Sequence, residues 1–179
     1  MNDKFPNAGN EKSTPVMVYT SNSLSRGEVI TRQAIRVNTW FRTQAAPEFL
    51  CIRKAQVLLQ GVAGLQNLAF DEYHIPIGQV LAMHMIPPVT DELDFDQSEP
   101  NRKMEPVTVM VSNFRMNACI RMATQSNLGK FLDTARETWL SIYEVEISNS
   151  SIPGMGVLHV PAAIIRLSGV TFATRRTDI

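Results

Sequence analysis

The sequence predicts a mainly β protein with two pseudo-symmetric, small β-barrel-like units, each built from about five strands and one short helix. Runs rich in β-branched and aromatic residues are short and end at Gly, Pro or polar turns, which is typical of strands. The apolar pattern of the first half returns in the second half, which indicates an internal repeat. With 179 residues, 44% of them hydrophobic and 19% charged, the chain has the composition of a folded protein with a buried core.

The repeat joins two stretches that lie about ninety residues apart. Residues 15–18 match residues 106–109 at an offset of 91, and residues 49–52 match residues 139–142 at an offset of 90. Insertions and deletions fall only where loops are predicted, as they do in a structural repeat. We therefore expect the two units to share one fold.

The spacing i, i+3, i+4 predicts one short helix in each unit and puts three apolar side chains on one helical face. The residues with this spacing are Val37, Trp40 and Phe41 in the first unit and Leu128, Phe131 and Leu132 in the second. The second helix has a candidate N-cap in Ser126 or Asn127, whereas Arg36 at the corresponding place offers no cap. Because they recur in register, Trp40 and Phe41 are expected in the core.

The frame His, branched apolar, Pro occurs at residues 74–76 and again at residues 159–161. Proline cannot donate to a strand ladder, so each proline is expected at a strand end, a turn or an edge. We expect a strand to end just before each proline, a short 3₁₀ turn to follow, and a last strand to begin near Val80 or Ile165. The frame makes the two histidines equivalent.

Composition sets the boundaries of the units and the surroundings expected for them. The stretch from Ile86 to Glu105 has two basic and six acidic residues, and it is interpreted as a solvated, self-repelling linker. The N-terminus lacks the pattern of a secretion signal and no apolar run is long enough for a membrane helix, so we expect a cytoplasmic protein without membrane contact. The predicted segments are a flexible tail at 1–14, a first unit at 15–86, an acidic linker at 87–105, a second unit at 106–172 and a C-terminal tail at 173–179.

Strand, Pro-initiated turn and strand together resemble the end of SH3-like small barrels, and the strand count is compatible with an SH3-like or Sm-like barrel. Each unit is also similar to an uncharacterised family of small bacterial β domains, in which a Gly-x-apolar strand precedes a short helix and a Phe-Leu-x-apolar strand. The matching residues are 27–29 and 49–52 in the first unit and 128–132 and 139–142 in the second, where Ala118 replaces the expected glycine. The resemblance implies a fold and supplies no activity or site residues.

No catalytic, cofactor or metal site is predicted. A paired metal role for His74 and His159 lacks Cys, Asp or Glu at ligand spacing around both of them. Residues 91–96 lack the glycine and the closing glutamate of a calcium loop. The Gly-rich stretch 61–64 lacks the Lys-Ser/Thr of a phosphate loop, and no serine lies in a Gly-x-Ser-x-Gly elbow. An enzyme is therefore not expected, and no cofactor is predicted.

Three functions follow from these observations. The preferred one is a non-catalytic protein-interaction or scaffold module, with a protein partner or a homo-oligomer, because duplication and neutral charge come without a convergent polar cluster. The alternative is an Sm-like binder of single-stranded nucleic acid that uses cations beside aromatic rings. Its candidate residues are Arg32, Arg36, Arg42, Arg53 and Lys54. The third is a small-ligand sensor with its pocket between the two units.

Overall fold

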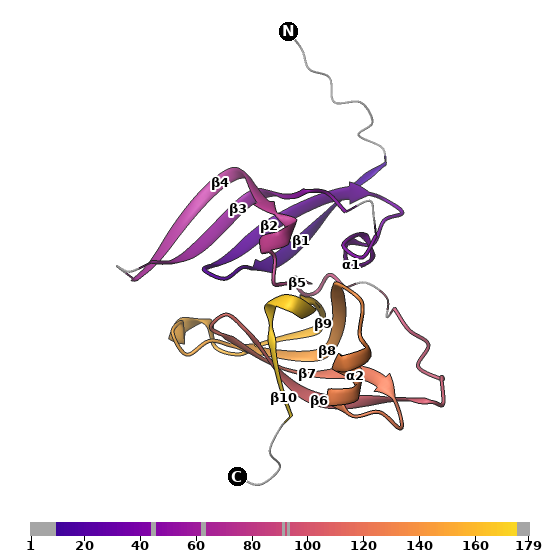
Figure 1. Cartoon of the computed structure of the whole chain (residues 1–179). Helices are drawn as coiled ribbons and strands as arrows, with labels where there is room; N and C mark the ends of the chain where they lie inside the picture. Colours follow the sequence, from indigo (N-terminus) through magenta and orange to yellow (C-terminus); the bar gives the residue numbers. More distant parts are fainter. Residues whose placement is uncertain (1–9, 44–45, 62–63, 91, 93, 175–179) are drawn as a thin grey trace.

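A computed structural model describes residues 10–174 except 44–45, 62–63, 91 and 93, and it is mainly β, as predicted. Each half contributes five strands and one α-helix (Figure 1). The first half contains β1 (Glu11–Tyr19), β2 (Ser23–Arg32), α1 (Val37–Trp40), β3 (Phe49–Gly61), β4 (Gly64–Pro76), the 3₁₀ turn η1 (Ile77–Gln79) and β5 (Ala82–Met85). The second contains β6 (Arg102–Val111), β7 (Phe114–Ala123), α2 (Leu128–Thr134), β8 (Trp139–Ser148), η2 (Pro153–Met155), β9 (Leu158–Arg166), η3 (Leu167–Gly169) and β10 (Thr171–Thr174).

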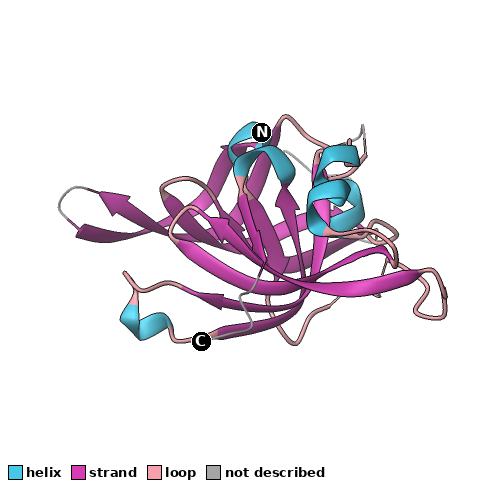
Figure 2. Cartoon of the chain, turned by 60° about the horizontal axis from the view of Figure 1, so that its bottom comes forward, coloured by secondary structure: helices cyan, strands magenta, loops and turns pink. Residues whose placement is uncertain are grey.

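All ten strands belong to one antiparallel sheet in the order β10-β6-β7-β8-β9-β5-β1-β2-β3-β4. Within each half the order is the same: the fifth strand lies beside the first, and the second, third and fourth follow. The halves meet where β5 pairs with β9, through Ala82 opposite Ile165 and Met83 opposite Ile164. Strands β4 and β10 each have one neighbour in the sheet. The two predicted barrels are therefore parts of one continuous, open sheet, whose long strands are accompanied by little helix (Figure 2).

A bulge interrupts the ladder at the same place in each half. The register between β2 and β3 shifts between Arg26 and Glu28, and the register between β7 and β8 shifts between Asn117 and Cys119. One residue in the facing strand takes a positive φ at each bulge, Lys54 at 50° and Glu144 at 52°. A bulge increases the local twist, so the two halves share this twist-inducing feature at the same place.

Three strands extend into the segments predicted as tails and linker. Strand β1 begins at Glu11, inside the predicted tail 1–14, and β6 begins at Arg102, inside the predicted linker 87–105. Strand β10 continues to Thr174, beyond the predicted start of the C-terminal tail at residue 173. Most of these residues are polar, and composition alone indicates a loop. Pairing across a hairpin or a sheet edge extends the strands, because it satisfies their backbone groups whatever the side chain is.

The two prolines of the His-x-Pro frame lie in different structural settings. Pro76 ends β4 and is followed by η1, as predicted, but Pro161 lies inside β9. The ladder between β8 and β9 includes neither Pro161 nor the bulge residue Glu144, so the missing N–H of the proline costs no pairing. The turn that corresponds to η1 is η3, and the last strand begins at Thr171 rather than near Ile165.

The predicted equivalence of the two histidines was consequently wrong. His74 lies opposite Cys51 in the ladder of β3 and β4, whereas His159 lies opposite Glu146 in the ladder of β8 and β9. The position that matches His74 by register is Ile164, opposite Ser141.

The core consists of two hydrophobic clusters, and each includes side chains from both halves. The cluster of the second half takes in Tyr19 and Ala82, and the cluster of the first half takes in Trp139 and Ile164. Phe41 is buried, as predicted, and its ring meets the Trp139 ring edge to face at 5.3 Å. Burying side chains of this size contributes roughly 1.5–3 kcal/mol each, so the contact between the halves adds to the stability of both.

Candidate functional site

The linker is docked on the sheet by Asp94. Its carboxylate accepts hydrogen bonds from Tyr143 and, at 3.0 Å, from Ser141, both on β8, and it forms an ion pair with Arg42 at 2.9 Å. Residues 94–102, called the strap below, therefore connect the first half to β8. Residues 94 and 96–101 are exposed, as expected of a solvated linker, but the segment is not self-repelling, because the Asp94 carboxylate is compensated by Arg42 and by two hydroxyls of β8.

An aromatic contact continues the strap beyond Asp94. Phe95 meets the Tyr143 ring edge to face at 4.9 Å, and the Arg121 guanidinium lies over the Phe95 ring at 4.6 Å from its centroid. Such contacts add roughly 0.5–1.5 kcal/mol beyond burial for an aromatic pair. Phe95 is thus the apolar anchor of a segment that is otherwise acidic.

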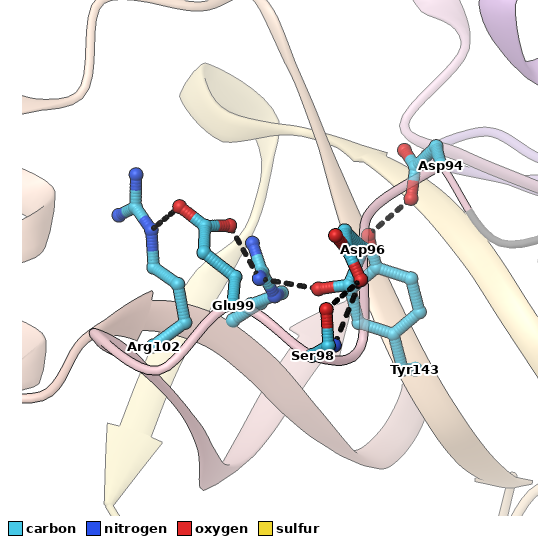
Figure 3. A network of polar contacts seen from close by, with 7 residues as sticks. Asp94, Asp96, Ser98, Glu99, Arg102 and Tyr143 are labelled. Atoms are coloured by element: carbon cyan, nitrogen blue, oxygen red, sulfur yellow. Dashed lines mark hydrogen bonds and ion pairs between the residues drawn. The ribbon is translucent and has the colours of Figure 1, made fainter.

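The acidic groups of the strap are compensated in turn (Figure 3). Arg121 donates to the Glu99 carboxylate at 2.6 Å and to the Asp96 carbonyl at 2.9 Å. Arg102 lies 3.5 Å from Glu99, and the Asp96 carboxylate accepts from the Ser98 backbone and hydroxyl at 2.8 and 2.7 Å. These hydrogen bonds lower the pKa of the Glu99 and Asp96 carboxyls.

Around Asp94 the polar groups satisfy one another. Burial by itself raises the pKa of the Asp94 carboxyl, but the hydrogen bonds from Tyr143 and Ser141 and the charge of Arg42 outweigh it and lower the pKa. Burial, followed by the hydrogen bond to Asp94, raises the pKa of Tyr143. Both hydroxyls donate to the carboxylate. A satisfied network of this kind holds a segment in place and leaves the Ser141 hydroxyl engaged with Asp94 and Arg42.

An open hollow of about 660 Å³ lies beside the strap and is lined by both halves. Arg166 lies over the Trp139 ring at 4.9 Å and donates to the carbonyls of Ile77 and Val80 at 2.7 and 3.1 Å. The hollow also has cationic and aromatic lining groups. These include Phe41, Arg42, Phe95, Arg102, Arg121 and Phe131.

The residues predicted for nucleic-acid binding are mostly paired with carboxylates. The pairs are Arg36 with Glu92, Arg42 with Asp94, Arg53 with Glu72 at 3.4 Å, and Lys54 with Glu28 at 3.1 Å. Arg32 lies at the exposed end of β2, opposite Glu11 in the ladder. Compensated cations offer little charge to phosphates. Nucleic-acid binding stays a prediction that this pairing disfavours.

A group of potential metal ligands lies on the outer hairpin of β3 and β4. His74 Nε2 lies 3.9 Å from Cys51 Sγ and 3.5 Å from a Glu72 oxygen. Sequence reasoning missed this group because Cys51 is 21 and 23 residues from Glu72 and His74 and meets them only through the register of the hairpin. A signal did exist, since Glu72 and His74 alternate on one strand face, but choosing Cys51 as the third member requires knowing its cross-strand partner.

The same hairpin carries exposed apolar side chains. Half of the large hydrophobic side chains that are exposed in the described part of the chain lie on it. They are Phe49 on β3, at 54% exposure, and Leu65, Leu68 and Phe70 on β4. Exposed apolar side chains on and beside an edge strand are typical of an interaction surface.

Comparisons with protein-family models, curated proteins and solved structures find no match to this chain. Within the described residues, no helix has the length and apolar content that crossing a bilayer requires.

Proposed function

We propose that this protein is a non-catalytic interaction module that assembles through the edges of its sheet. The observation that supports it best is the joint between β5 and β9. There the fifth strand of one half pairs with the fourth strand of the other. The strands in the two remaining corresponding positions, β10 and β4, are the outer edges of the sheet. The chain thus contains one completed joint and both partners of a second.

A second copy of the chain is the partner that this arrangement fits. An edge strand presents a row of unpaired backbone groups that another strand can extend. If β10 of one copy pairs with β4 of the next, a fifth strand pairs with a fourth strand, as β5 does with β9 inside the chain. The two copies then contribute different surfaces to the contact. Contacts of this head-to-tail type close into rings or grow into filaments, depending on the rotation between copies. Exposed Phe49 and Phe70 on the outer hairpin would gain cover in such an assembly.

We also infer that the two halves arose by duplication of a unit of about seventy residues. Their common strand order, the matching bulges and the positive φ values of Lys54 and Glu144 support this inference. A duplicated unit whose copies already pair edge to edge supports assembly of whole chains by the same contact.

Light scattering coupled to size-exclusion chromatography tests the assembly. The chain should form species larger than its 20.0 kDa monomer, and their share should rise with concentration. Adding lysines at two exposed positions of β10, Thr171→Lys and Thr174→Lys, should produce monomers because charge on an edge opposes pairing. Gln125→Lys, on an exposed turn away from β10, is the matched control and should assemble like the original chain. A chain that stays monomeric at several hundred micromolar, or assembles regardless of the β10 lysines, contradicts the proposal.

A small-ligand site in the hollow is the second candidate function, supported by its volume of about 660 Å³ and its lining from both halves. Its aromatic lining favours a ligand with a flat ring, and its arginines are already engaged with Asp94, Glu99 and backbone carbonyls, so an uncharged ligand is favoured over an anion. Trp139 contacts the hollow, so an uncharged nucleoside added as a probe should quench its fluorescence. Trp40→Phe removes the other tryptophan and should preserve the quenching. An unchanged Trp139 signal at ten millimolar probe would exclude this class of ligand.

A further inference from the structure

The outer hairpin brings a thiol, an imidazole and a carboxylate to one face of the sheet. Strands β3 and β4 pair Cys51 with His74 and Arg53 with Glu72. Because alternate residues of a strand share a face and paired residues lie side by side, Cys51, His74 and Glu72 form a compact triangle. Within the described residues, they are the group of three such side chains whose ligand atoms all lie within 4.8 Å of one another.

The distances in this triangle fit a tetrahedral zinc ion. With zinc bonds of about 2.3 Å to sulfur and about 2.1 Å to nitrogen or oxygen, tetrahedral angles separate S and N by about 3.6 Å and N and O by about 3.4 Å. The corresponding separations here are 3.9 Å for Cys51 Sγ to His74 Nε2 and 3.5 Å for His74 Nε2 to the Glu72 oxygen. These two sides need adjustments of a few tenths of an ångström. The third side, from Cys51 Sγ to the Glu72 oxygen, lies within 4.8 Å, so closing it to about 3.6 Å takes at most about 1.2 Å of side-chain movement, and the backbone ladder can stay as it is.

We propose that Cys51, Glu72 and His74 bind a zinc ion, with water as the fourth ligand. A set of one sulfur, one nitrogen and one oxygen selects zinc over magnesium or calcium, which prefer oxygen alone. The side chains of His74 and Glu72 are 55% and 51% exposed, so the fourth position is open to solvent. Three protein ligands with an open position form the coordination pattern in which zinc keeps a water.

Arg53 orients the carboxylate for this role. It pairs with Oε1 of Glu72 at 3.4 Å, while Oε2 of the same group is the oxygen that faces His74. One oxygen is thereby held and the other is directed at the metal position, which is how groups beyond the ligands commonly position them. The Glu72–Arg53 ion pair and metal binding use different oxygens and are compatible.

The ion would link the two outermost strands of the first half across the ladder. It would lie beside the edge that β4 presents and stiffen a hairpin whose β4 has no neighbour on its far side. This inference does not depend on the proposed self-association, because all three ligands come from one chain.

The second half offers two matched controls, each with two of the three ligand types. Cys119 Sγ lies 3.9 Å from a Glu144 oxygen, and His159 is paired across the ladder with Glu146. If any exposed thiol or imidazole beside a carboxylate took up metal, these sites would bind as well.

Titration of the full, metal-free chain with zinc chloride in a calorimeter tests the site, with cobalt(II) as an absorption probe of thiolate ligation. We expect one ion per chain. Cys51→Ser should abolish the near-ultraviolet thiolate–cobalt band, and Cys119→Ser should keep it. His74→Gln and Glu72→Gln should each weaken zinc binding at least about tenfold, the lower loss seen even for outer-shell changes. His159→Gln should bind like the original chain.

Circular dichroism establishes that each variant is folded. If Cys51→Ser does not fold, the two substitutions at the exposed residues His74 and Glu72 decide the question alone. The proposal is wrong if the chain takes up less than half an equivalent of zinc, if binding survives His74→Gln and Glu72→Gln unchanged, or if Cys119→Ser removes the cobalt band.

Discussion

The hairpin of β3 and β4 and the hairpin of β8 and β9 occupy the same place in their halves but differ in cover. In β9, Ile164 and Ile165 are fully buried because β5 lies beside them. The matching residues of β4 are His74, which is exposed, and Ile75, which is buried in the cluster of the first half. The comparison shows that the residue types along a strand depend on the strands beside it as much as on its place in the topology.

The fifth strands differ in the same way. All four residues of β5 are buried, whereas Phe172 is the only residue of β10 that is not exposed. Strand β5 lies between β1 and β9, and β10 has β6 alone. The equivalent positions of the two halves therefore provide paired sites at which one substitution can be compared with its counterpart.

The largest difference is expected at the central position of the fifth strands, Met83 in β5 and Phe172 in β10, which face Val18 and Val109. Met83→Ala removes a fully buried side chain and should lower the free energy of unfolding by about 2–5 kcal/mol. Phe172→Ala should cost roughly 1 kcal/mol because its side chain is only partly buried.

Urea denaturation at a concentration where the chain is monomeric measures both. If both substitutions lower the free energy of unfolding equally, the outer strand β10 is as well buried as the inner strand β5.

The next difference concerns the bulges, where the first half has Gly27 and the second half has Ala118. A Cβ on Gly27 would lie 2.5 Å from Cγ2 of Ile52 and 2.6 Å from the Arg53 carbonyl oxygen. Gly27→Ala should therefore destabilise the protein by about 1–3 kcal/mol through overpacking. Ala118→Gly, the reverse change, should cost only about 0.5–1 kcal/mol of backbone entropy. Thermal unfolding that ranks the two variants the other way would contradict this account of the bulge.

A third difference is sensitivity to acid, which the first half should carry through His84. This residue lies in β5, and the position that matches it in β10 is Ala173. Its Nδ1–H donates to the Met85 carbonyl at 2.8 Å, and its Nε2 accepts from the Tyr19 hydroxyl at 3.0 Å. Burial lowers the pKa of His84 from its usual 6.5, so the folded chain holds the neutral ring. As the pH falls below 6.5 the unfolded chain gains a proton that the folded chain does not, and stability drops by up to about 1.4 kcal/mol per pH unit.

Denaturation at several values between pH 7.5 and about pH 5, above the range where carboxyls titrate, checks this slope. His84→Gln should flatten it even though it lowers stability at neutral pH. His159→Gln, at an exposed position, should leave the slope unchanged.

The smallest effect is expected for nucleic acid. The positions that match Arg32, Arg36 and Arg42 in the second half are Ala123, Asn127 and Asp133, so any such binding belongs to the first half. Because Arg36 is already paired with Glu92, Arg32→Ala with Arg36→Ala should change binding to single-stranded RNA less than about threefold at physiological salt. Fluorescence anisotropy measures this binding. If the original chain binds RNA in a way that salt abolishes, and the double variant binds tenfold more weakly, the alternative function would be revived.

Local features were predictable because short-range chemistry determines them. The Asn127 side chain accepts from the Lys130 backbone N–H at 2.9 Å, as expected of the second N-cap, and Arg36 makes no side-chain cap. Both helices begin at the predicted residues, Val37 and Leu128. Strand formers and turn residues likewise gave the mainly β class.

Features that depend on register or on distant neighbours were not predictable. The His-x-Pro frame looks identical at residues 76 and 161, and only the gap in the ladder opposite Glu144 shows that the second proline can lie within a strand. Asp94 has an ordinary acidic neighbourhood in the sequence, and its partners Arg42 and Tyr143 are 52 and 49 residues away. The triangle of Cys51, Glu72 and His74 depends on pairing in the same manner.

The strap and the shared clusters have a consequence for how the molecule would come apart. Because Phe41 packs on Trp139 and Asp94 accepts hydrogen bonds from Ser141 and Tyr143, a single cut in the exposed segment between Asp96 and Asn101 would sever the chain without separating its pieces. The fragments would migrate together until a denaturant is added. The covalent link between the halves brings them together during folding. Noncovalent contacts are then sufficient to hold them together.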